Sequence, residues 1–208
     1  MKILAVVLLV LLAIFLVLYV TLIGRRRLAQ RTTALVPVPP PVPGTDQTGT
    51  DQTGTVRFGP LEAVYVSTTL HGDWLARVGA HGLGDRSNAL VSVHDGGVLV
   101  EREGADDLWV PVHTIRSTNL APGMAGKYVG ADGLVVLTWA VPEADGVAAA
   151  LVDTGLRTRR AEDRGALVDA VRHLLAAQQP QQYVQQDPLQ YPYPQDPHQQ
   201  DPHQQEAR

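Results

Sequence analysis

Residues 88–103 read NALVSVHDGGVLVERE and carry the strongest fold signal in the chain. Two runs rich in β-branched and apolar residues flank Asp95-Gly96-Gly97, a tight-turn sequence. This arrangement predicts a β-hairpin with strands over 88–94 and 98–103. Further runs of the same kind lie at 61–69, 108–112, around Ile115, at 134–141 and at 147–157. About six or seven strands at this spacing predict an antiparallel sheet or barrel.

The hydrophobic period changes after the last of these runs. Residues 161–176 read AEDRGALVDAVRHLLA, and their apolar side chains recur at helical spacing, at Leu167, Val168, Val171, Leu174 and Leu175. This pattern predicts one amphipathic helix whose apolar face caps the sheet. The sequence therefore predicts a mainly-β domain over residues 56–176 that ends in a helix.

Residues 3–23 carry no charge, and 17 of these 21 residues are Leu, Ile, Val or Phe. As a helix this stretch would measure about 31 Å, the thickness of a hydrocarbon core. Arg25, Arg26, Arg27 and Arg31 follow it, whereas a single lysine precedes it. The positive-inside bias predicts a retained single-pass anchor in the inner membrane, with the later residues in the cytoplasm. The arginines at 25–27 are also candidate contacts for anionic head groups.

A cleaved secretory signal is the alternative interpretation of this N-terminal stretch. Signal peptides have a shorter apolar core and a small-residue cleavage site directly after it. Here the apolar stretch is longer, and arginines occupy the place of the cleavage site. We therefore expect the lipid bilayer to be one partner of the chain.

Two segments have a composition that does not support a packed core. Residues 24–55 are first basic and then rich in Pro, Thr and Gln, with TDQTG occurring twice; residues 177–208 are rich in Gln and Pro, with QDPHQ occurring twice. Proline at this density opposes a continuous helix or strand. The first segment is therefore expected to be a linker from which the domain hangs near the membrane without being fixed to it, and the second a disordered tail.

A longer string, residues 108–175, carries a family resemblance. Its most informative residues are Trp109, Pro111, Ile115, the Gly123–Gly126 run with Lys127, Gly133-Leu134, Trp139 and the Asp153-Thr154-Gly155 turn. Together with the N-terminal apolar stretch, they resemble the pleckstrin-homology-like (PH-like) domain of a family of single-pass actinobacterial membrane proteins, some of which are labelled transporter or export protein. The resemblance covers residues 57–176. It implies a seven-stranded, partly open barrel capped by a C-terminal helix, and it implies no known activity.

No motif in the sequence predicts catalysis. The segment from Gly123 to Lys127 lacks the spacing and the Ser or Thr of a phosphate-binding loop and is expected to be a turn. The absence of cysteine excludes thiolate nucleophiles and thiolate metal sites. A convergence of Ser92, His94 and Asp95 in three dimensions stays open, and paired acids such as Glu101 and Glu103 are expected to be solvated. We predict a protein that is not an enzyme and that has no cofactor, no metal site and no identified small-molecule substrate.

The domain has one basic cluster, Arg157, Arg159 and Arg160, just before the predicted helix. The helix dipole disfavours cations there, so head-group phosphates or an acidic partner would offset the cost; pairing with Glu162 and Asp163 is the alternative. A net charge of −4 and 5% aromatic residues argue against nucleic-acid binding. We predict a non-catalytic protein-interaction or scaffolding module with an unknown protein partner. An anionic-lipid-binding module and an accessory subunit of a transport or export system are the alternatives.

Overall fold

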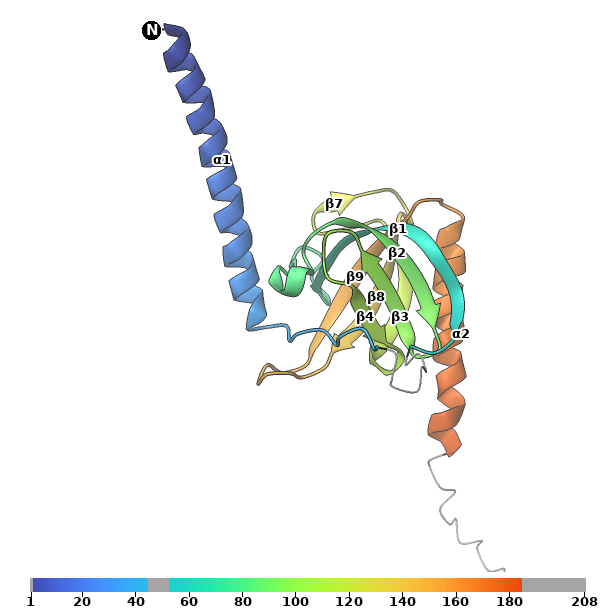
Figure 1. The fold of residues 1–208 in the computed structure, drawn as a ribbon. Coiled ribbons are helices and arrows are strands. Elements are labelled where there is room, and N and C mark those ends of the chain that lie inside the picture. The colour runs from blue at the N-terminus through green and yellow to red at the C-terminus, as the bar shows by residue number, and fades with distance from the viewer. Residues whose placement is uncertain (1, 45–52, 185–208) are drawn as a thin grey trace, which may run out of the picture. The chain divides into compact units, whose positions relative to one another are not determined.

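The computed structural model describes residues 2–44 and 53–184 (Figure 1). These residues form two α-helices, nine strands and two short 3-10 helices. Their bounds are α1 (Lys2–Thr33), β1 (Val56–Leu70), η1 (Ala80–Gly82), β2 (Ser87–His94), β3 (Gly97–Arg102), β4 (Leu108–Pro111), η2 (Val112–Thr114), β5 (Ile115–Ala121), β6 (Gly123–Met124), β7 (Lys127–Tyr128), β8 (Leu134–Val141), β9 (Ala150–Thr158) and α2 (Asp163–Val184).

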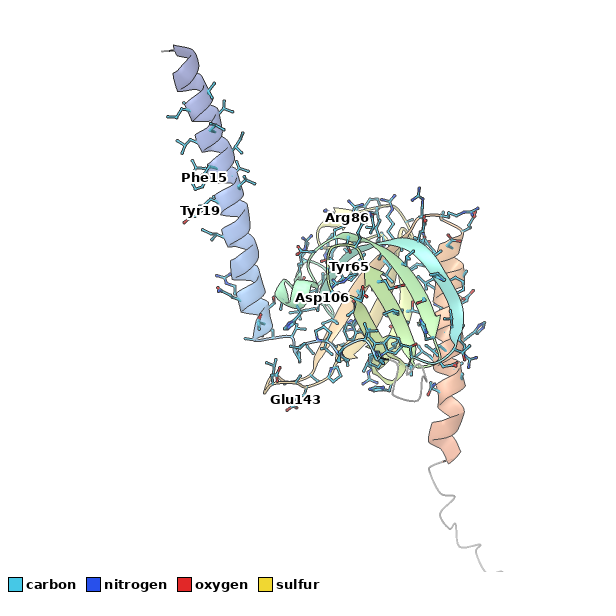
Figure 2. The ribbon with its side chains drawn as sticks, in the orientation of Figure 1. Phe15, Tyr19, Tyr65, Arg86, Asp106 and Glu143 are labelled. Carbon is cyan, nitrogen blue, oxygen red and sulfur yellow. The ribbon has the colours of Figure 1, made fainter. Side chains whose placement is uncertain are left out.

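The N-terminal helix α1 is 32 residues long and displays apolar side chains such as Phe15 and Tyr19 to the surroundings (Figure 2). Phe15 is 62% exposed and Tyr19 53% exposed, with their rings stacked. The structure describes these side chains without a break from Val7 to Val20. Across the part of the chain whose side chains are described, no helix is both long and apolar enough to span a bilayer.

Seven strands form one antiparallel sheet in the order β4-β3-β2-β1-β9-β8-β5, and β6 and β7 form a separate hairpin. The sheet turns about β1, which has 15 residues and pairs with β2 along its first part and β9 along its second. Irregularities in its pairing occur between Val56 and Phe58, Phe58 and Leu61, and Tyr65 and Ser67. Such bulges bend a strand and increase its twist, so that β1 belongs to both halves of the sheet. The predicted antiparallel mainly-β domain is therefore confirmed.

The predicted hairpin is also confirmed, with His94 opposite Gly97 and a two-residue loop between them. Gly97 lies so close to β4 that a Cβ atom on it would overlap the Val110 carbonyl oxygen. The loop residue Asp95 accepts hydrogen bonds from the Arg57 guanidinium and the Thr55 N–H. These bonds hold the pKa of the Asp95 carboxyl below its usual value. The hairpin is thereby joined to the start of β1.

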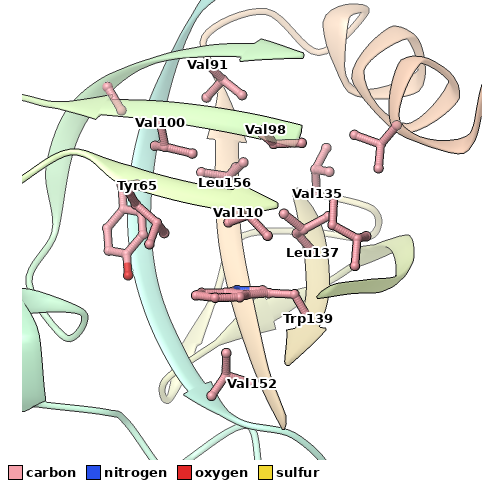
Figure 3. Close-up of a cluster of buried hydrophobic side chains, with 14 of the residues drawn as sticks. Tyr65, Val91, Val98, Val100, Val110, Val135, Leu137, Trp139, Val152 and Leu156 are labelled. Atoms are coloured by element: carbon pink, nitrogen blue, oxygen red, sulfur yellow. The ribbon is translucent and has the colours of Figure 1, made fainter. Parts of the chain in front are cut away.

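The hydrophobic core lies between the sheet and α2, and Figure 3 shows its centre. Trp139 on β8 is fully buried there among valine and leucine side chains of β2, β3, β4 and β9. The predicted apolar face of the helix supplies Leu167, Val168, Val171 and Leu174, which are at most 4% exposed, while Leu175 packs at the margin. The prediction that a C-terminal helix caps the sheet is confirmed.

A chain of hydrogen bonds crosses this core. Trp139 Nε1–H donates to Thr154 Oγ1 (2.9 Å), Thr154 to Thr68 Oγ1 (2.8 Å), Thr68 to the Tyr65 hydroxyl (2.7 Å), and Tyr65 to the Leu83 carbonyl oxygen (2.7 Å). An indole can only donate and a carbonyl can only accept, so the two ends fix the direction of every bond between them. All five residues have an exposed fraction of 0%. Burial raises the pKa of Tyr65 to about 12, which keeps its hydroxyl protonated as a donor.

Replacing Thr154 by Val interrupts this chain without changing the volume of the side chain much. The Trp139 N–H then loses its acceptor and the Thr68 hydroxyl loses the group to which it was bonded. We expect the free energy of unfolding to fall by about 2–3 kcal/mol. Urea titration of the full-length chain in detergent micelles, followed by tryptophan fluorescence, measures the change. Thr154→Ser keeps the hydroxyl and should recover most of the stability; equal losses in the two variants would contradict this account.

The expected free linker is wrong at its N-terminal end, because α1 continues to Thr33 and the chain after it contacts the domain. The Thr32 hydroxyl oxygen accepts hydrogen bonds from the Gly79 N–H (3.0 Å) and the Ala80 N–H (2.8 Å). Val36 is fully buried in the core cluster. His81 Nε2–H donates to the Val36 carbonyl oxygen at 3.1 Å. The helix end is thus bonded to η1 by contacts that the linker composition does not reveal.

Three further boundaries differ from the prediction. Helix α2 continues to Val184 through Pro180, past the predicted start of the tail at 177, because alanine and glutamine are good helix formers. Strand β1 begins at Val56, five residues before the predicted start at 61. Gly59 and Pro60 interrupt the apolar pattern of this first part, so the pattern alone does not reveal it. Strand β9 begins at Ala150, three residues after the predicted start at 147. The QDPHQ repeats and most of the TDQTG repeats lie outside the described residues.

Introducing a charge at Val36 tests the contact between the linker and the domain. Val36→Asp places a carboxylate in an apolar site, and we expect it to lower the free energy of unfolding by about 3 kcal/mol or more. Val38, two residues away, is 49% exposed and supplies the matched control Val38→Asp, for which a change within about 0.5 kcal/mol is expected. The same urea titration measures both variants. Similar stability of the two variants would show that Val36 does not support the fold.

Candidate functional site

A groove of about 720 Å³ lies on the sheet where β3, β2, β1 and β9 run side by side. Four short segments and one loop residue line it: Glu62–Val64, Asn88–Leu90, Glu101–Glu103, Arg157–Arg159 and Asp107. They come from parts of the sequence up to 97 residues apart, from Glu62 to Arg159. Only the pairing of the strands brings them together.

Strand register explains which of these side chains face the groove. Ala63, Ala89, Arg102 and Thr158 form one row across the four strands and are buried. Because side chains alternate along a strand, the residues before and after this row point to the opposite, outer face. The groove-facing side chains are therefore Glu62, Val64, Asn88, Leu90, Glu101, Glu103, Arg157 and Arg159.

The groove has opposite charges along its two sides. Glu101 on β3 and Glu103 just after this strand line one side, and Arg157 on β9 and Arg159 just after that strand line the other. The backbones of β3 and β9 are three strand spacings apart, about 14 Å measured along the sheet. Between them β1 and β2 contribute two apolar side chains, Val64 and Leu90, and two polar ones, Glu62 and Asn88, and Leu90 is 41% exposed.

Several of the charged groups already have partners within the groove. Arg159 Nη1 lies 3.2 Å from a Glu62 carboxylate oxygen, with both side chains more than half exposed, and such a pair contributes about 0–1 kcal/mol. Among the residues that the structure describes, the Arg157 guanidinium and the Glu101 carboxylate have neither an ion-pair nor a hydrogen-bond partner. One unpaired charge of each sign therefore faces the groove, from opposite sides.

A buried arginine supports the floor of the groove from inside. Arg102 is 6% exposed, and its guanidinium lies 4.8 Å from the centre of the Tyr65 ring. Its Nε–H donates to the Asp106 carbonyl oxygen at 2.6 Å and its Nη1–H to the Gly82 carbonyl oxygen at 2.8 Å. Asp107 Oδ1 accepts the Arg102 backbone N–H at 2.9 Å. Arg102 is therefore a structural residue, in contrast to the exposed Arg157.

Exchanging arginine for lysine separates these two roles. Lysine lacks the planar fork that lets Arg102 reach two carbonyl oxygens and stack on Tyr65. We expect Arg102→Lys to lower the free energy of unfolding by about 1–3 kcal/mol, and Arg157→Lys to change it by no more than about 0.5 kcal/mol. Thermal or urea unfolding of the full-length chain measures both. A loss at position 157 as large as that at position 102 would contradict the assignment.

The predicted basic cluster is divided by the structure. Arg157 and Arg159 line the groove, whereas Arg160 lies outside it and pairs with Glu162 at 2.5 Å. The predicted alternative of pairing with Glu162 is thus confirmed for Arg160 alone. Arg159 pairs with Glu62, a partner from β1 that sequence proximity does not indicate. The side chains of the residues at 25–27, also predicted as contacts, lie outside the described part of α1.

Ser92 and His94 do converge, with Ser92 Oγ 2.9 Å from His94 Nε2. They are two residues apart on β2, so that both side chains lie on the same face of the strand. His94 Nδ1 is 3.4 Å from the Gly54 carbonyl oxygen, while Asp95 is bonded to Arg57 instead of to His94. Ser92 is 5% exposed and His94 6% exposed. The pair therefore has neither the third member of a triad nor an opening for a substrate.

The glycine-rich segment that resembles a phosphate loop is a turn, as predicted. Gly123–Met124 and Lys127–Tyr128 pair as β6 and β7. The two residues between them, Ala125 and Gly126, both have positive φ (52° and 77°), the combination found in tight hairpin turns. The segment therefore has hairpin geometry.

The sequence resemblance implied a seven-stranded, partly open barrel capped by a C-terminal helix, and the structure has a seven-stranded antiparallel sheet capped by such a helix. A model of the family described as Bacterial PH domain-like matches residues 40–172, which is more than half of the chain. The chain belongs to this Bacterial PH domain-like family. No curated protein matches the chain closely enough to add a second comparison.

Sequence reasoning identified two residues of the groove, Arg157 and Arg159, and missed its other charged members. Glu101 and Glu103 alternate on a predicted strand, which indicates that they share a face. What the sequence lacks is the order of the strands, which places β3 and β9 on opposite sides of the same groove. Acidic residues on one predicted strand and basic residues on another are the sequence signal that indicates a groove with both signs of charge.

Proposed function

We propose that this chain is a membrane-anchored, non-catalytic binding protein whose PH-like domain holds a protein partner in the groove between β3 and β9, on the cytoplasmic side of the membrane. The single observation that carries the proposal is the groove itself, with unpaired Arg157 and Glu101 on opposite sides of the apolar side chains Val64 and Leu90. Protein interfaces combine such an apolar centre with a polar rim.

The membrane anchor in this proposal rests on the N-terminal sequence. Residues 3–23 are uncharged and belong to the continuous helix α1. From Val7 to Val20 the large hydrophobic side chains are about half exposed or more, for example Leu9 at 69%. A water-exposed apolar helix surface of this extent is unfavourable, whereas lipid would cover it. The arginines after the apolar stretch favour the cytoplasm for the domain.

The charges of the groove define the chemistry of its partner. Glu101 on β3 and Glu103 just after it favour basic groups, and Arg157 on β9 favours an acidic group. The backbones of β3 and β9 are about 14 Å apart along the sheet, a separation comparable to the diameter of a helix with its side chains, which is about 10–12 Å. The partner that fits is a protein segment of helix size with a basic edge, an acidic edge and apolar side chains between them.

The same charges disfavour an anionic lipid head group in this groove. A phosphate would meet the carboxylates of Glu62, Glu101 and Glu103 as well as the guanidinium groups. Like charges at close range cost free energy, and this cost opposes affinity for phosphate. The protein-binding hypothesis is therefore favoured over head-group binding at this site.

Site-specific crosslinking in the native membrane tests the proposal. A photoreactive phenylalanine analogue at position 90 of the full-length chain should yield an adduct of defined mass with a protein. Arg157→Glu should lower the yield by about tenfold, which corresponds to 1.4 kcal/mol. Arg160→Glu is the matched control, because Arg160 lies just beyond the groove and already pairs with Glu162.

Two results would refute the protein-binding groove. One is the absence of a protein adduct from position 90 when an equally exposed position outside the groove, Leu120, does give one. The other is an equal effect of the Arg157 and Arg160 charge reversals, because only the first of these residues lines the groove.

A further inference from the structure

Two loops at the other end of β1 together form an exposed apolar patch, which we define as Trp74, Leu75 and Tyr128. Their exposed fractions are 54%, 61% and 73%. Trp74 and Leu75 belong to the loop between β1 and η1, and Tyr128 ends the β6–β7 hairpin. None of these side chains contributes to the core cluster of the domain.

The two loops are held together, so that the patch is a defined surface. The Ala125 N–H at the tip of the hairpin donates to the Trp74 carbonyl oxygen at 2.7 Å. A Cβ atom on Gly126 would lie 3.8 Å from Leu75 Cδ2, so the leucine side chain rests against the hairpin.

A side-chain cap orders the loop itself. Asp73 Oδ1 accepts the backbone N–H of Leu75 at 2.9 Å and of Ala76 at 3.2 Å. The Leu70 N–H and the Ala76 carbonyl oxygen close the base of the loop at 2.9 Å. Trp74 and Leu75 are therefore presented on an ordered turn.

The chemistry of the patch fits the interface of a bilayer. Indole and phenol rings have an apolar body and a polar group, and tryptophan and tyrosine concentrate at membrane interfaces for this reason. Leu75 adds a purely apolar side chain, and the exposed Lys127 stands beside Tyr128. The negative charge of the nearby Asp73 balances the positive charge of Lys127. The patch therefore suits insertion into the interface of a phospholipid bilayer more than attraction to anionic head groups.

The connection to α1 brings the patch within reach of that interface. Thr32, which bonds to Ala80, follows the end of the apolar stretch at residue 23 by nine residues, or about 14 Å of helix. Head groups occupy about 5–8 Å on each side of the hydrocarbon core. Trp74 precedes Ala80 by six residues, a span of at most about 20 Å. The patch therefore lies no more than about 20 Å from the point at which the domain is bonded to α1, and that point is about 14 Å of helix from the apolar stretch.

We infer that Trp74, Leu75 and Tyr128 insert into the bilayer interface beside the anchor helix and so orient the domain on the membrane. This inference rests on the membrane anchor of the proposed function. The groove lies near Glu62 and the patch follows Leu70, eight residues and about 26 Å further along β1. With the patch in the bilayer, the groove at the middle of β1 lies outside the bilayer.

Tryptophan quenching tests the insertion directly. The chain has three tryptophans, and Trp109 and Trp139 are at most 4% exposed, so a quencher in the bilayer reaches Trp74 selectively. The full-length chain is reconstituted into phosphatidylcholine vesicles with brominated acyl chains and compared with the same vesicles without bromine. We expect bromine to quench the wild type, and Trp74→Phe to abolish this quenching. Leu75→Glu should weaken it, whereas the matched control Leu120→Glu, on the 40% exposed Leu120 of β5, should not.

A second probe checks the orientation. Leu90→Trp in the Trp74→Phe background places a tryptophan in the groove, and we expect bromine not to quench it. Extraction of the vesicles with alkaline carbonate is measured in parallel and reports the anchor alone. Wild-type chain that resists extraction without being quenched overturns the insertion and leaves the anchor intact. Release of the chain by carbonate overturns the anchor and this inference with it. Quenching that persists in Trp74→Phe also overturns the insertion.

Discussion

The structure depends on one hydrogen-bond chain whose direction is fixed at both ends, by the Trp139 indole and the Leu83 carbonyl oxygen. It joins β8, β9 and β1 to the segment before β2, so that the two halves of the sheet share a common polar connection inside an apolar core. A buried polar chain of this kind stabilises a single packing arrangement, because any shift of one strand leaves donors without acceptors. The Arg102 guanidinium packs on the Tyr65 ring, which belongs to this hydrogen-bond chain, and Arg102 lies on the inner face of the strands that form the groove.

The segment from η1 to Leu83 joins this core to helix α1 and to Arg102 beneath the groove. At η1 the Ala80 N–H bonds to Thr32 of α1, and two residues later the Gly82 carbonyl oxygen accepts a hydrogen bond from Arg102. The groove lies at the middle of β1, at Glu62–Val64, and the apolar patch follows the C-terminal end of this strand at Leu70. In the proposed function the groove is therefore a separate surface that stays available to a partner when the patch contacts the bilayer. The contacts in the core, the attachment of α1 and the position of the groove thus agree with one another.

The arginines before α2 illustrate how strand geometry decides function. Arg157 lies on β9 and Arg159 is the first residue after it, so that the two side chains are two positions apart and both line the groove. Arg160 follows the end of the strand and pairs with its neighbour Glu162. A cluster that looks uniform in sequence therefore contains two groove residues and one locally paired residue. The acids on and just after β3 give the groove both signs of charge, which favours a protein partner over a phosphate.

The sequence by itself determined the local elements. The turn at Asp95 and Gly96, the apolar strands and the helical spacing from Leu167 onward all follow from the preferences of neighbouring residues, and the observed sheet and capping helix agree with them. Tertiary structure alone decided the burial of Val36, the partner of Arg159 and the contact between the Trp74 loop and the β6–β7 hairpin. These features depend on which distant strands and loops pack together, and that choice is made by the summed packing and hydrogen bonding of the whole core. A short stretch of sequence does not reveal these contacts, because the interactions that decide them come from residues far apart in the chain.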